Sequence, residues 1–261
     1  MIKIVSGWSA EGGSTFSLME LCDLFNERGV DCTFYGPHDW HLDKCSSADK
    51  TENIRLSPDD TLLFHFMEMP QRPPCKRVVM SCHETSIFSI KSHNVQGADA
   101  IRFVSQFQKD WQGVDGTVIP NLVRGITKSK NAGGNIAGVV GTINPIKGVH
   151  ESIQRALKDG CDKVYVYGNV SDHNYFNAKV SPLFSDKVIY KGMESDRQKI
   201  YDSISYVYQS NVSEVPESFG RVRAECIRAG IEYRGNDAAT TQFDLWEEDQ
   251  VFDAFTELLQ L

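Results

Sequence analysis

Two glutamates, Glu217 and Glu225, stand eight positions apart just before and inside a helix-like run that ends at Gly230. If Gly220 opens this helix, Glu225 lies in its early turns and Glu217 lies in the loop before it. Carboxylates accept hydrogen bonds from vicinal hydroxyls, and the free N–H groups of a helix N-terminus favour a phosphate. The spacing therefore predicts a site for a ligand that carries both groups. An acidic, solvated helix start is the plain alternative.

Two glycine-bearing loops follow segments with the pattern of strands. Gly12 and Gly13 come after the apolar run 1–5, and glycine lets a backbone approach a ligand closely. The loop 141–148 carries Lys147, which would place an ammonium where a diphosphate could lie. A tight turn and a solvated lysine explain these features equally well when each is taken alone. Neither the dinucleotide fingerprint nor the phosphate-loop pattern is present, which disfavours an oxidoreductase of the Rossmann type.

One histidine, His83, follows the apolar run 77–81. Ligands of open α/β proteins bind at the carboxyl ends of the strands, so His83 is a candidate functional residue, with a structural histidine as the alternative. Cys75, Cys82 and Glu84 stand near it, but their spacing matches no zinc pattern. We therefore expect no metal site.

Strand-like and helix-like runs alternate along the first half of the chain, which is typical of a parallel sheet with helices on its faces. The predicted strands cover residues 1–5, 32–35, 61–66, 77–81, 100–104 and 117–119. Ser14 is an N-cap candidate for a helix that runs to Arg28. Residues 124–135 are polar and glycine-bearing without hydrophobic periodicity, so we interpret them as an interdomain linker.

The alternation begins again after this linker. Strands are predicted over 136–140, 163–167, 187–190, 206–209 and 231–234, and helices over 149–159, 172–178, 195–203, 220–229 and 247–259. The sequence thus predicts an α/β protein with two doubly wound, Rossmann-like domains, residues 1–123 and 136–261, that face each other across a cleft.

In order and spacing, these features resemble one family over nearly the whole chain: the retaining glycosyltransferases of glycosyltransferase family four, which have the GT-B fold. The segments that carry the resemblance are Gly12-Gly13, Ser81-Cys82-His83, 98–105, 118–121, 141–148, 165–168, and Ser210 with Glu217, Phe219-Gly220 and Glu225. The last set keeps the Glu-x7-Glu spacing of the family in full. Thr142 departs from it, because the family has an arginine there, and the segments after Gly230 are short, as in a compact version of the fold.

The resemblance implies how a nucleotide diphosphate sugar would be bound. Glu217 and the N–H groups near Phe219 and Gly220 would hold the donor sugar, and Glu225 would bind the ribose hydroxyls. The loops that would line the donor contain Gly12, Gly13, Gly141, Thr142 and Gly168. The nucleotide is expected to be uridine-linked.

The resemblance also implies the catalytic residues. Lys147 would offset the charge of the diphosphate, His83 would contact the sugar or the acceptor, and Glu217 would complete the set. No covalent nucleophile, metal or further cofactor would be needed, because the leaving diphosphate can itself take the acceptor proton.

Composition limits the class of protein that the chain can be. The 261 residues are 41% hydrophobic, which suits a protein with real cores. No apolar run is long enough to span a bilayer and the N-terminus lacks the features of a signal peptide, so we expect a cytoplasmic protein. The 7 cysteines form no C-x-x-C pair, and their odd number argues against a disulfide framework.

Charge bears on the acceptor. The formal net charge of −8 disfavours nonspecific binding to nucleic acid, yet residues 72–130 hold nine Lys or Arg against four Asp or Glu. The sequence leaves the acceptor open between a glycan and a hydroxymethylated base of phage-type DNA, with a slight lean toward a polyanion. A non-catalytic nucleotide-sugar-binding protein of the same fold is the main alternative to an enzyme. The sequence predicts no oligomeric state.

Overall fold

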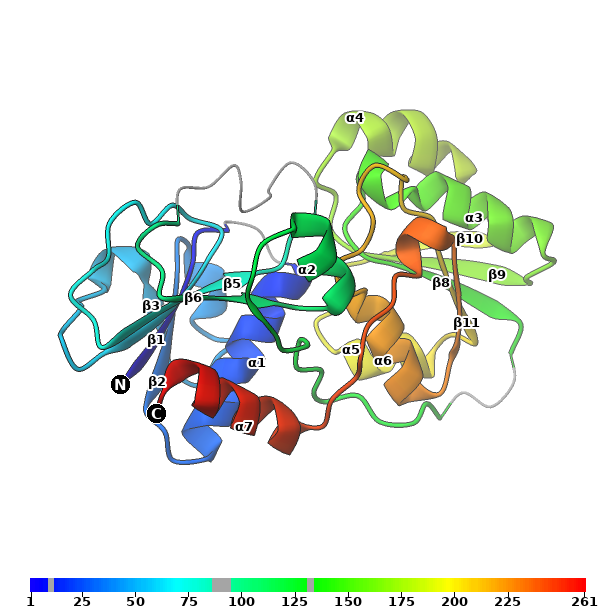
Figure 1. Ribbon diagram of the computed structural model, residues 1–261. Helices are drawn as coiled ribbons and strands as arrows, with labels where there is room; N and C mark the ends of the chain where they lie inside the picture. The colour runs from blue at the N-terminus through cyan, green and yellow to red at the C-terminus, as the bar shows by residue number, and fades with distance from the viewer. Residues whose placement is uncertain (9–11, 86–94, 131–133) are drawn as a thin grey trace. The chain divides into compact units, whose positions relative to one another are not determined.

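The structure is a computed structural model that describes residues 1–8, 12–85, 95–130 and 134–261 (Figure 1). Residues 9–11 of the first glycine loop, Lys91 of the basic segment and residues 131–133 of the predicted linker lie outside the described residues. The chain forms two compact units. The first combines Met1–Leu122 with Gln242–Leu261, and the second is Val123–Thr241.

The first unit is built on a parallel sheet of seven strands in the order β3-β2-β1-β4-β5-β6-β7. The strands are β1 Ile2–Ser6, β2 Cys32–Gly36, β3 Ala48–Lys50, β4 Thr61–His65, β5 Arg77–Cys82, β6 Ala100–Phe103 and β7 Thr117–Val118. All five residues of β1 and all five of β4 are buried, as expected for the centre of a parallel sheet that is covered on both faces.

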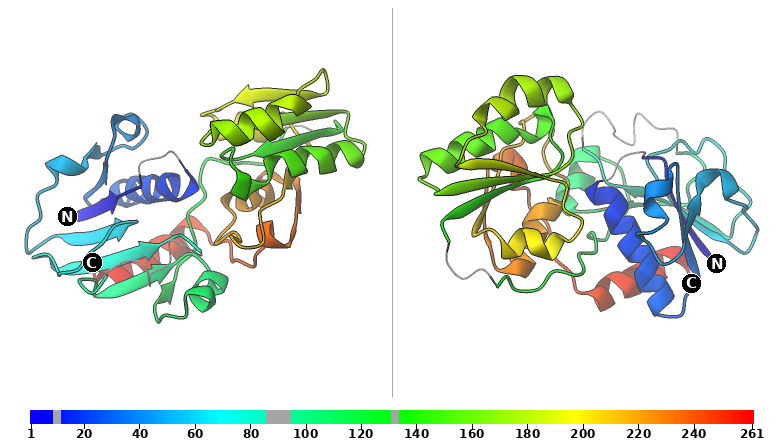
Figure 2. Two further views of the ribbon diagram at one scale, coloured as in Figure 1. Left: turned by 90° about the horizontal axis from the view of Figure 1, so that it is seen from above. Right: turned by 180° about the vertical axis from the view of Figure 1, so that it is seen from behind.

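Two helices cover one face of this sheet, α1 (Gly13–Glu27) and α7 (Glu248–Leu259), while α2 (Gln106–Gln112) follows β6. Figure 2 shows α7 running beside α1. The buried side chains of α7 recur at helical spacing and join the same hydrophobic cluster as α1: Val251, Phe255, Leu258 and Leu259.

This placement differs from the predicted boundary, which assigned residues 136–261 to the second domain. The structure returns Gln242–Leu261 to the first unit. The physical reason is the apolar stripe of α7, which packs against Phe25 of α1, with the Phe25 and Phe255 ring centroids 6.4 Å apart. The stripe shows that the helix needs a partner but not which sheet provides it.

The second unit has a parallel sheet of five strands in the order β10-β9-β8-β11-β12. Its strands are β8 Ile136–Val140, β9 Lys163–Tyr167, β10 Val188–Gly192, β11 Tyr206–Gln209 and β12 Glu232–Gly235. Its helices are α3 Val149–Lys158, the short α4 His173–Tyr175, α5 Arg197–Asp202 and α6 Arg221–Ala229. Helices α3 and α4 pack on one face of the sheet and α5 and α6 on the other (Figure 1). The two Rossmann-like α/β domains predicted from the sequence are thus confirmed.

The predicted linker, 124–135, is part of the second unit where it is described. Ile126 is buried in the cluster that contains Ile200 of α5, and the Thr127 N–H donates to Gln198 Oε1 at 2.8 Å. The Lys130 N–H donates to Asp202 Oδ1 at 3.0 Å. Side chains of α5 therefore satisfy the backbone of this polar segment, which the lack of periodicity could not reveal.

Two general features complete the fold. All seven cysteines are buried free thiols. Among the described residues, no helix is long and apolar enough to cross a membrane.

Candidate functional site

The site in the second unit lies where the strand order reverses. Strand β8 is flanked by β9 and β11, and the helices that follow β8 and β11, α3 and α6, cover opposite faces of the sheet. The loops after these two strands meet: a Cβ at Gly148 would collide with the carbonyl oxygen of Ser210, and Gly148 has φ +49°. Only glycine allows this approach, which brings Lys147 beside the end of β11. Such a reversal is where α/β proteins bind ligands.

Glu217 is held through one carboxylate oxygen. Its Oε1 accepts hydrogen bonds from Lys147 Nζ, from Gln209 Nε2 at 2.8 Å and from Asn211 Nδ2 at 3.0 Å. No described residue donates a hydrogen bond to Oε2, and the side chain is 14% exposed. One oxygen is therefore fixed by the protein, while the other can accept hydrogen bonds from a ligand.

The Glu217 carboxylate stays ionised although it is largely buried. Burial raises its pKa, but the charge of Lys147 and the hydrogen bonds from Asn211 and Gln209 outweigh burial and hold the pKa below its ordinary value. Its main chain is fixed as well, because the Glu217 N–H donates to Ala238 O at 2.8 Å and Thr241 Oγ1 donates to the Glu217 carbonyl at 2.6 Å.

Glu225 lies in a different environment, with its side chain only 5% exposed. Its Oε1 accepts from Arg197 Nη1 and from Arg221 Nε at 2.9 Å, and its Oε2 accepts from Tyr201 OH at 2.6 Å. Burial raises the Glu225 pKa, and the two arginines together with Tyr201 bring it below its ordinary value. The carboxylate is ionised, but the protein contacts both of its oxygens.

Helix α6 begins one residue later than predicted. Gly220 is its N-cap at φ +67°, and Arg221 is its first residue. The Phe219 ring is 2% exposed and packs in the interior, so the ring itself does not face a ligand.

Two further glycines from the predicted donor loops contact each other. Gly141 has φ +138° and Gly168 has φ +144°, and a Cβ at Gly168 would collide with the Gly141 carbonyl oxygen. The packing of the two loops thus explains Gly168 without a ligand. Thr142 follows Gly141 and is half-buried.

The arginine missing at Thr142 has two candidate substitutes, and both make bonds elsewhere. Arg221 pairs with Glu225, and Arg223 Nη1 donates to the Thr241 carbonyl at 2.7 Å. The second unit therefore has Lys147 beside Glu217. Arg221 and Arg223 are both bonded elsewhere, and neither is shown in the place of the arginine that the family has at position 142.

His83 is in the first unit, directly after β5, and is 6% exposed. Its Nε2 lies 2.9 Å from Ser81 Oγ and 3.1 Å from Arg102 Nη1. A guanidinium only donates, so Nε2 accepts and the ring proton of neutral His83 belongs on Nδ1. Burial, then the neighbouring His65, then Arg102 lower the His83 pKa well below its ordinary value. His83 is therefore suited to donating a hydrogen bond and not to shuttling protons near neutral pH.

A series of polar side-chain contacts that was not predicted from the sequence lies beside His83. Ser6 Oγ lies 2.9 Å from His65 Nδ1, and His65 Nε2 lies 2.7 Å from Glu84 Oε1. The His65 and His83 rings are 4.7 Å apart, and Glu84 Oε2 accepts from the His83 N–H at 3.1 Å. His65 ends β4, so the rule that singled out His83 at the end of β5 could also have found it.

The first glycine loop differs slightly from its prediction. Helix α1 begins at Gly13 with Gly12 as its N-cap, whereas Ser14 was expected to cap it. Gly12 has an extended backbone that any residue can adopt, at φ −163°, and the helix has no acidic residue in its first turn. The backbone geometry of Gly12 thus does not require glycine.

The predicted site residues fall into two sets, each within one unit. The second unit contains Gly141, Thr142, Lys147, Gly168, Glu217, Phe219, Gly220 and Glu225, and the first contains Gly12, Gly13 and His83. Four residues that position the two glutamates were not predicted from the sequence: Gln209, Asn211, Arg197 and Tyr201.

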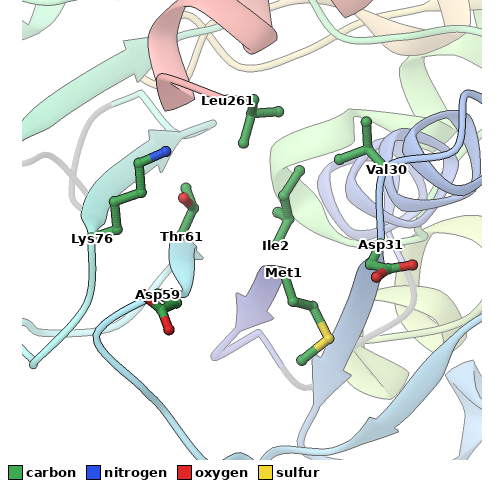
Figure 3. A pocket seen from close by; sticks show the side chains of 8 residues that line it. All are labelled: Met1, Ile2, Val30, Asp31, Asp59, Thr61, Lys76 and Leu261. Carbon is green, nitrogen blue, oxygen red and sulfur yellow. The ribbon is translucent and has the colours of Figure 1, made fainter.

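In the part of the chain that the structure describes, no group of three or more His, Cys, Asp or Glu residues is arranged to hold a metal ion. A cavity of about 170 Å³ lies at the amino ends of β1 and β4, the ends opposite to His83 (Figure 3). It is lined by Met1, Ile2, Val30, Asp31, Asp59, Thr61, Lys76 and Leu261 and contains none of the predicted site residues.

Comparison with known proteins gives matches in structure alone. No protein-family model matches the chain, and no curated protein sequence matches it. HepE from Anabaena, solved in complex with UDP-glucose, is 12% identical with a TM-score of 0.66 over 98% of this chain and 89% of that chain. WaaG, a glycosyltransferase involved in lipopolysaccharide biosynthesis, is 11% identical with a TM-score of 0.63 over 100% and 91%. A glycosyltransferase from Rickettsia africae is 14% identical with a TM-score of 0.60 over 98% and 89%.

At these identities the similarity concerns the fold. The chain has the two-domain α/β fold of GT-B glycosyltransferases, as the sequence predicted. Membership of glycosyltransferase family four stays a prediction.

Proposed function

We propose that this protein is a retaining glycosyltransferase that moves a sugar from a uridine diphosphate sugar to a hydroxyl of an acceptor. The observation that carries the proposal is the Glu217 carboxylate, whose Oε1 is fixed by Lys147, Gln209 and Asn211 while Oε2 accepts no hydrogen bond from a described residue. An ionised carboxylate only accepts, so its natural ligand at Oε2 is a hydroxyl group. The similarity in fold to HepE, solved with UDP-glucose, supports the choice of donor.

The second unit supplies the donor contacts in this proposal. Glu217 Oε2 accepts from the sugar hydroxyls, Lys147 moves to the diphosphate, and the N–H groups near Gly220 face the leaving oxygens. Glu225 accepts from the ribose. Since its two oxygens offer about four acceptor positions and three donors already reach them, Glu225 has room for one ribose hydroxyl. Gly141 and Thr142 line the donor through their main chain.

Transfer then proceeds with retention at the sugar carbon. The bond from this carbon to the diphosphate oxygen breaks, the acceptor oxygen bonds to the same face, and the acceptor proton passes to a diphosphate oxygen. Lys147 stabilises the negative charge that grows on the diphosphate, and such stabilisation accelerates the step because it is stronger in the transition state than in the bound donor. No protein carboxylate forms a covalent bond and no metal is required in this scheme.

His83 contacts the sugar or the acceptor in this proposal. With Nε2 accepting from Arg102, the ring presents Nδ1–H, which donates to a hydroxyl oxygen. Its lowered pKa keeps the ring neutral, so it orients a hydroxyl and the diphosphate takes the proton. The reaction is proposed for the cytoplasm.

The proposal is tested by mass spectrometry of transfer products with a panel of nucleotide sugars and acceptors, including glycans and hydroxymethylcytosine DNA. Wild type should transfer sugar, Glu217→Ala should lose transfer by about 100-fold or more while remaining folded, and Glu214→Ala, at an exposed position in the same loop, should behave like wild type. Equal turnover by Glu217→Ala and wild type would remove Glu217 from the site. NMR of the first product formed should show the anomeric configuration of the donor.

A second candidate function is non-catalytic binding of a nucleotide sugar. It is favoured by Thr142, which puts no charge where the family has an arginine, and by the bonds that Arg221 and Arg223 make elsewhere. Calorimetry and a donor-hydrolysis assay distinguish the two functions. Donor binding without hydrolysis or transfer across the whole panel would support the binding protein.

A further inference from the structure

Two buried amides hold Glu217 together with Lys147. Gln209 is the last residue of β11 and is 6% exposed, and Asn211 follows two residues later and is 3% exposed. Gln209 Nε2 lies 2.8 Å from Glu217 Oε1 and also donates to Asn211 Oδ1 at 3.0 Å. The two amides therefore support each other as well as the carboxylate.

The orientation of the Gln209 amide follows from its partners. The Glu217 carboxylate can only accept, so the NH2 group of Gln209 must face it. The amide oxygen then points to Tyr233 on β12, whose OH donates to Gln209 Oε1 at 3.1 Å. Asn211 is anchored by Asn236, whose Nδ2 donates to the Asn211 carbonyl at 2.7 Å. Residues of β11, β12 and the loops after them thus form one connected support.

The third donor differs from these two. Lys147 ends a short helical turn, Pro145–Lys147, and its side chain is 30% exposed and flexible. If its ammonium turns to a diphosphate, Glu217 loses its only positively charged partner among the described residues. A carboxylate that is buried without donors takes up a proton, and a protonated Glu217 would no longer be the acceptor that a sugar hydroxyl needs.

We propose that Gln209 and Asn211 are positioning residues, which hold Oε1 of Glu217 so that Oε2 faces the donor sugar and keep the carboxylate ionised when Lys147 turns to the diphosphate. The inference rests on the proposed function for the identity of the ligand. The hydrogen bonds of the support are contacts within the chain itself.

The first test measures Glu217 itself in the unliganded protein. The carbon NMR signal of its carboxyl group, assigned with Glu217→Gln, should titrate at a higher pH in Gln209→Met and in Asn211→Leu than in wild type, because each variant removes a donor to the charged form and keeps a similar volume. Gln209→Glu should raise the Glu217 pKa further, since it places a second carboxylate beside Glu217. Gln154→Met, at an exposed position of α3, is the matched control.

The second test measures binding and turnover of UDP-glucose against pH. Turnover should fall about tenfold in Gln209→Met and Asn211→Leu, and the loss of activity on acidification should begin at a higher pH than in wild type. Thermal unfolding of each variant identifies any loss that comes from unfolding, and a purely structural role would leave the pH profile unmoved.

The outcomes distinguish a wrong function from a wrong role for the two amides. Absence of UDP-glucose binding and of all transfer in wild type would overturn the proposed function, while the NMR titration would still decide whether the amides keep Glu217 ionised. A folded Gln209→Met and a folded Asn211→Leu with the wild-type Glu217 pKa and pH profile would overturn the positioning role.

Discussion

At the scale of single residues, the two glutamates have the same side chain but lie in different environments. Glu225 is buried and Glu217 largely so, and both have a pKa below the ordinary value, because cations and hydrogen bonds outweigh burial. They differ in access: Glu225 is contacted at both oxygens, whereas Glu217 is fixed at Oε1 alone. Glu217 is therefore the stronger candidate for direct contact with a ligand, and the proposed contact of Glu225 with the ribose is limited to a single bond.

Removal of the Lys147 charge should change the pH dependence of stability. The folded pKa of Glu217 lies below its unfolded value, so in wild type this group stabilises the fold above the unfolded pKa and loses that contribution as the pH falls through the folded pKa. In Lys147→Met the Glu217 pKa rises, and the variant should be about 1–3 kcal/mol less stable than wild type near pH 7. Denaturation in urea between about pH 4 and pH 7 should show this difference shrinking on acidification. A difference that stays constant or grows toward acid would contradict the pairing.

His83 should not take up a proton in the physiological range. Burial, His65 and Arg102 all lower its pKa, so it stays neutral as the pH falls through the ordinary histidine value. Nitrogen-resolved NMR of the ring should show one neutral tautomer with the proton on Nδ1 between about pH 6 and pH 8. A titration of His83 near its ordinary value would argue against the buried contact with Arg102.

The sequence predicted the site residues that belong to a recognisable motif. Glu217, Glu225 and Lys147 lie at fixed spacing beside glycines, and the structure places Lys147 on Glu217. Gln209 and Asn211 could not be found in this way, because an amide after a strand has many structural uses and its role depends on which carboxylate the fold brings to it. Arg197 and Tyr201 come from α5 and meet Glu225 only in three dimensions.

At the scale of elements, strands were predicted better than helix partners. The limits of β8, β9 and β11 match the prediction, since each is a short apolar run between polar segments. The short strand β3, Ala48–Lys50, has no apolar pattern and was missed. Helix α7 was predicted as a helix, but the sheet on which it packs was not predicted correctly. An amphipathic pattern shows which face of a helix is buried and does not show which part of the protein covers that face.

The packing of α7 predicts which unit a substitution in this helix destabilises. Phe255 is 1% exposed and packs on α1, so Phe255→Ala should destabilise the first unit by about 3–5 kcal/mol. Hydrogen exchange followed by mass spectrometry should show faster exchange in β1 and α1 and unchanged exchange in β8 and β9. Glu257→Ala, at an exposed position of the same helix, is the control. Faster exchange confined to the second unit would mean that α7 packs there in solution.

At the scale of the whole molecule, charge limits the acceptor. The basic residues of 72–130 have different environments: Arg102 is 2% exposed in the interior and Arg72 pairs with Asp99, while Arg124, Lys128 and Lys130 belong to the second unit. The formal net charge of the whole chain is −8. Because Arg102 and Arg72 are engaged within the protein, we expect a glycan and not DNA as the acceptor.

This expectation has a direct test in salt dependence. Binding to hydroxymethylcytosine duplex DNA should be weak at low salt and should change little as salt is raised, since few phosphates would be neutralised. Fluorescence anisotropy over a range of salt concentrations measures the slope. Tight binding that falls steeply with salt would restore DNA as the acceptor.

The central claim is that the second unit binds a nucleotide diphosphate sugar through Glu217, and titration calorimetry of UDP-glucose into wild type, Glu217→Gln and Glu214→Ala tests it most directly. We expect wild type and Glu214→Ala to bind with the same affinity and Glu217→Gln to bind at least about tenfold more weakly, because the amide cannot replace the charged acceptor. Equal affinity in all three proteins, or no binding of any uridine diphosphate sugar by wild type, would contradict the account.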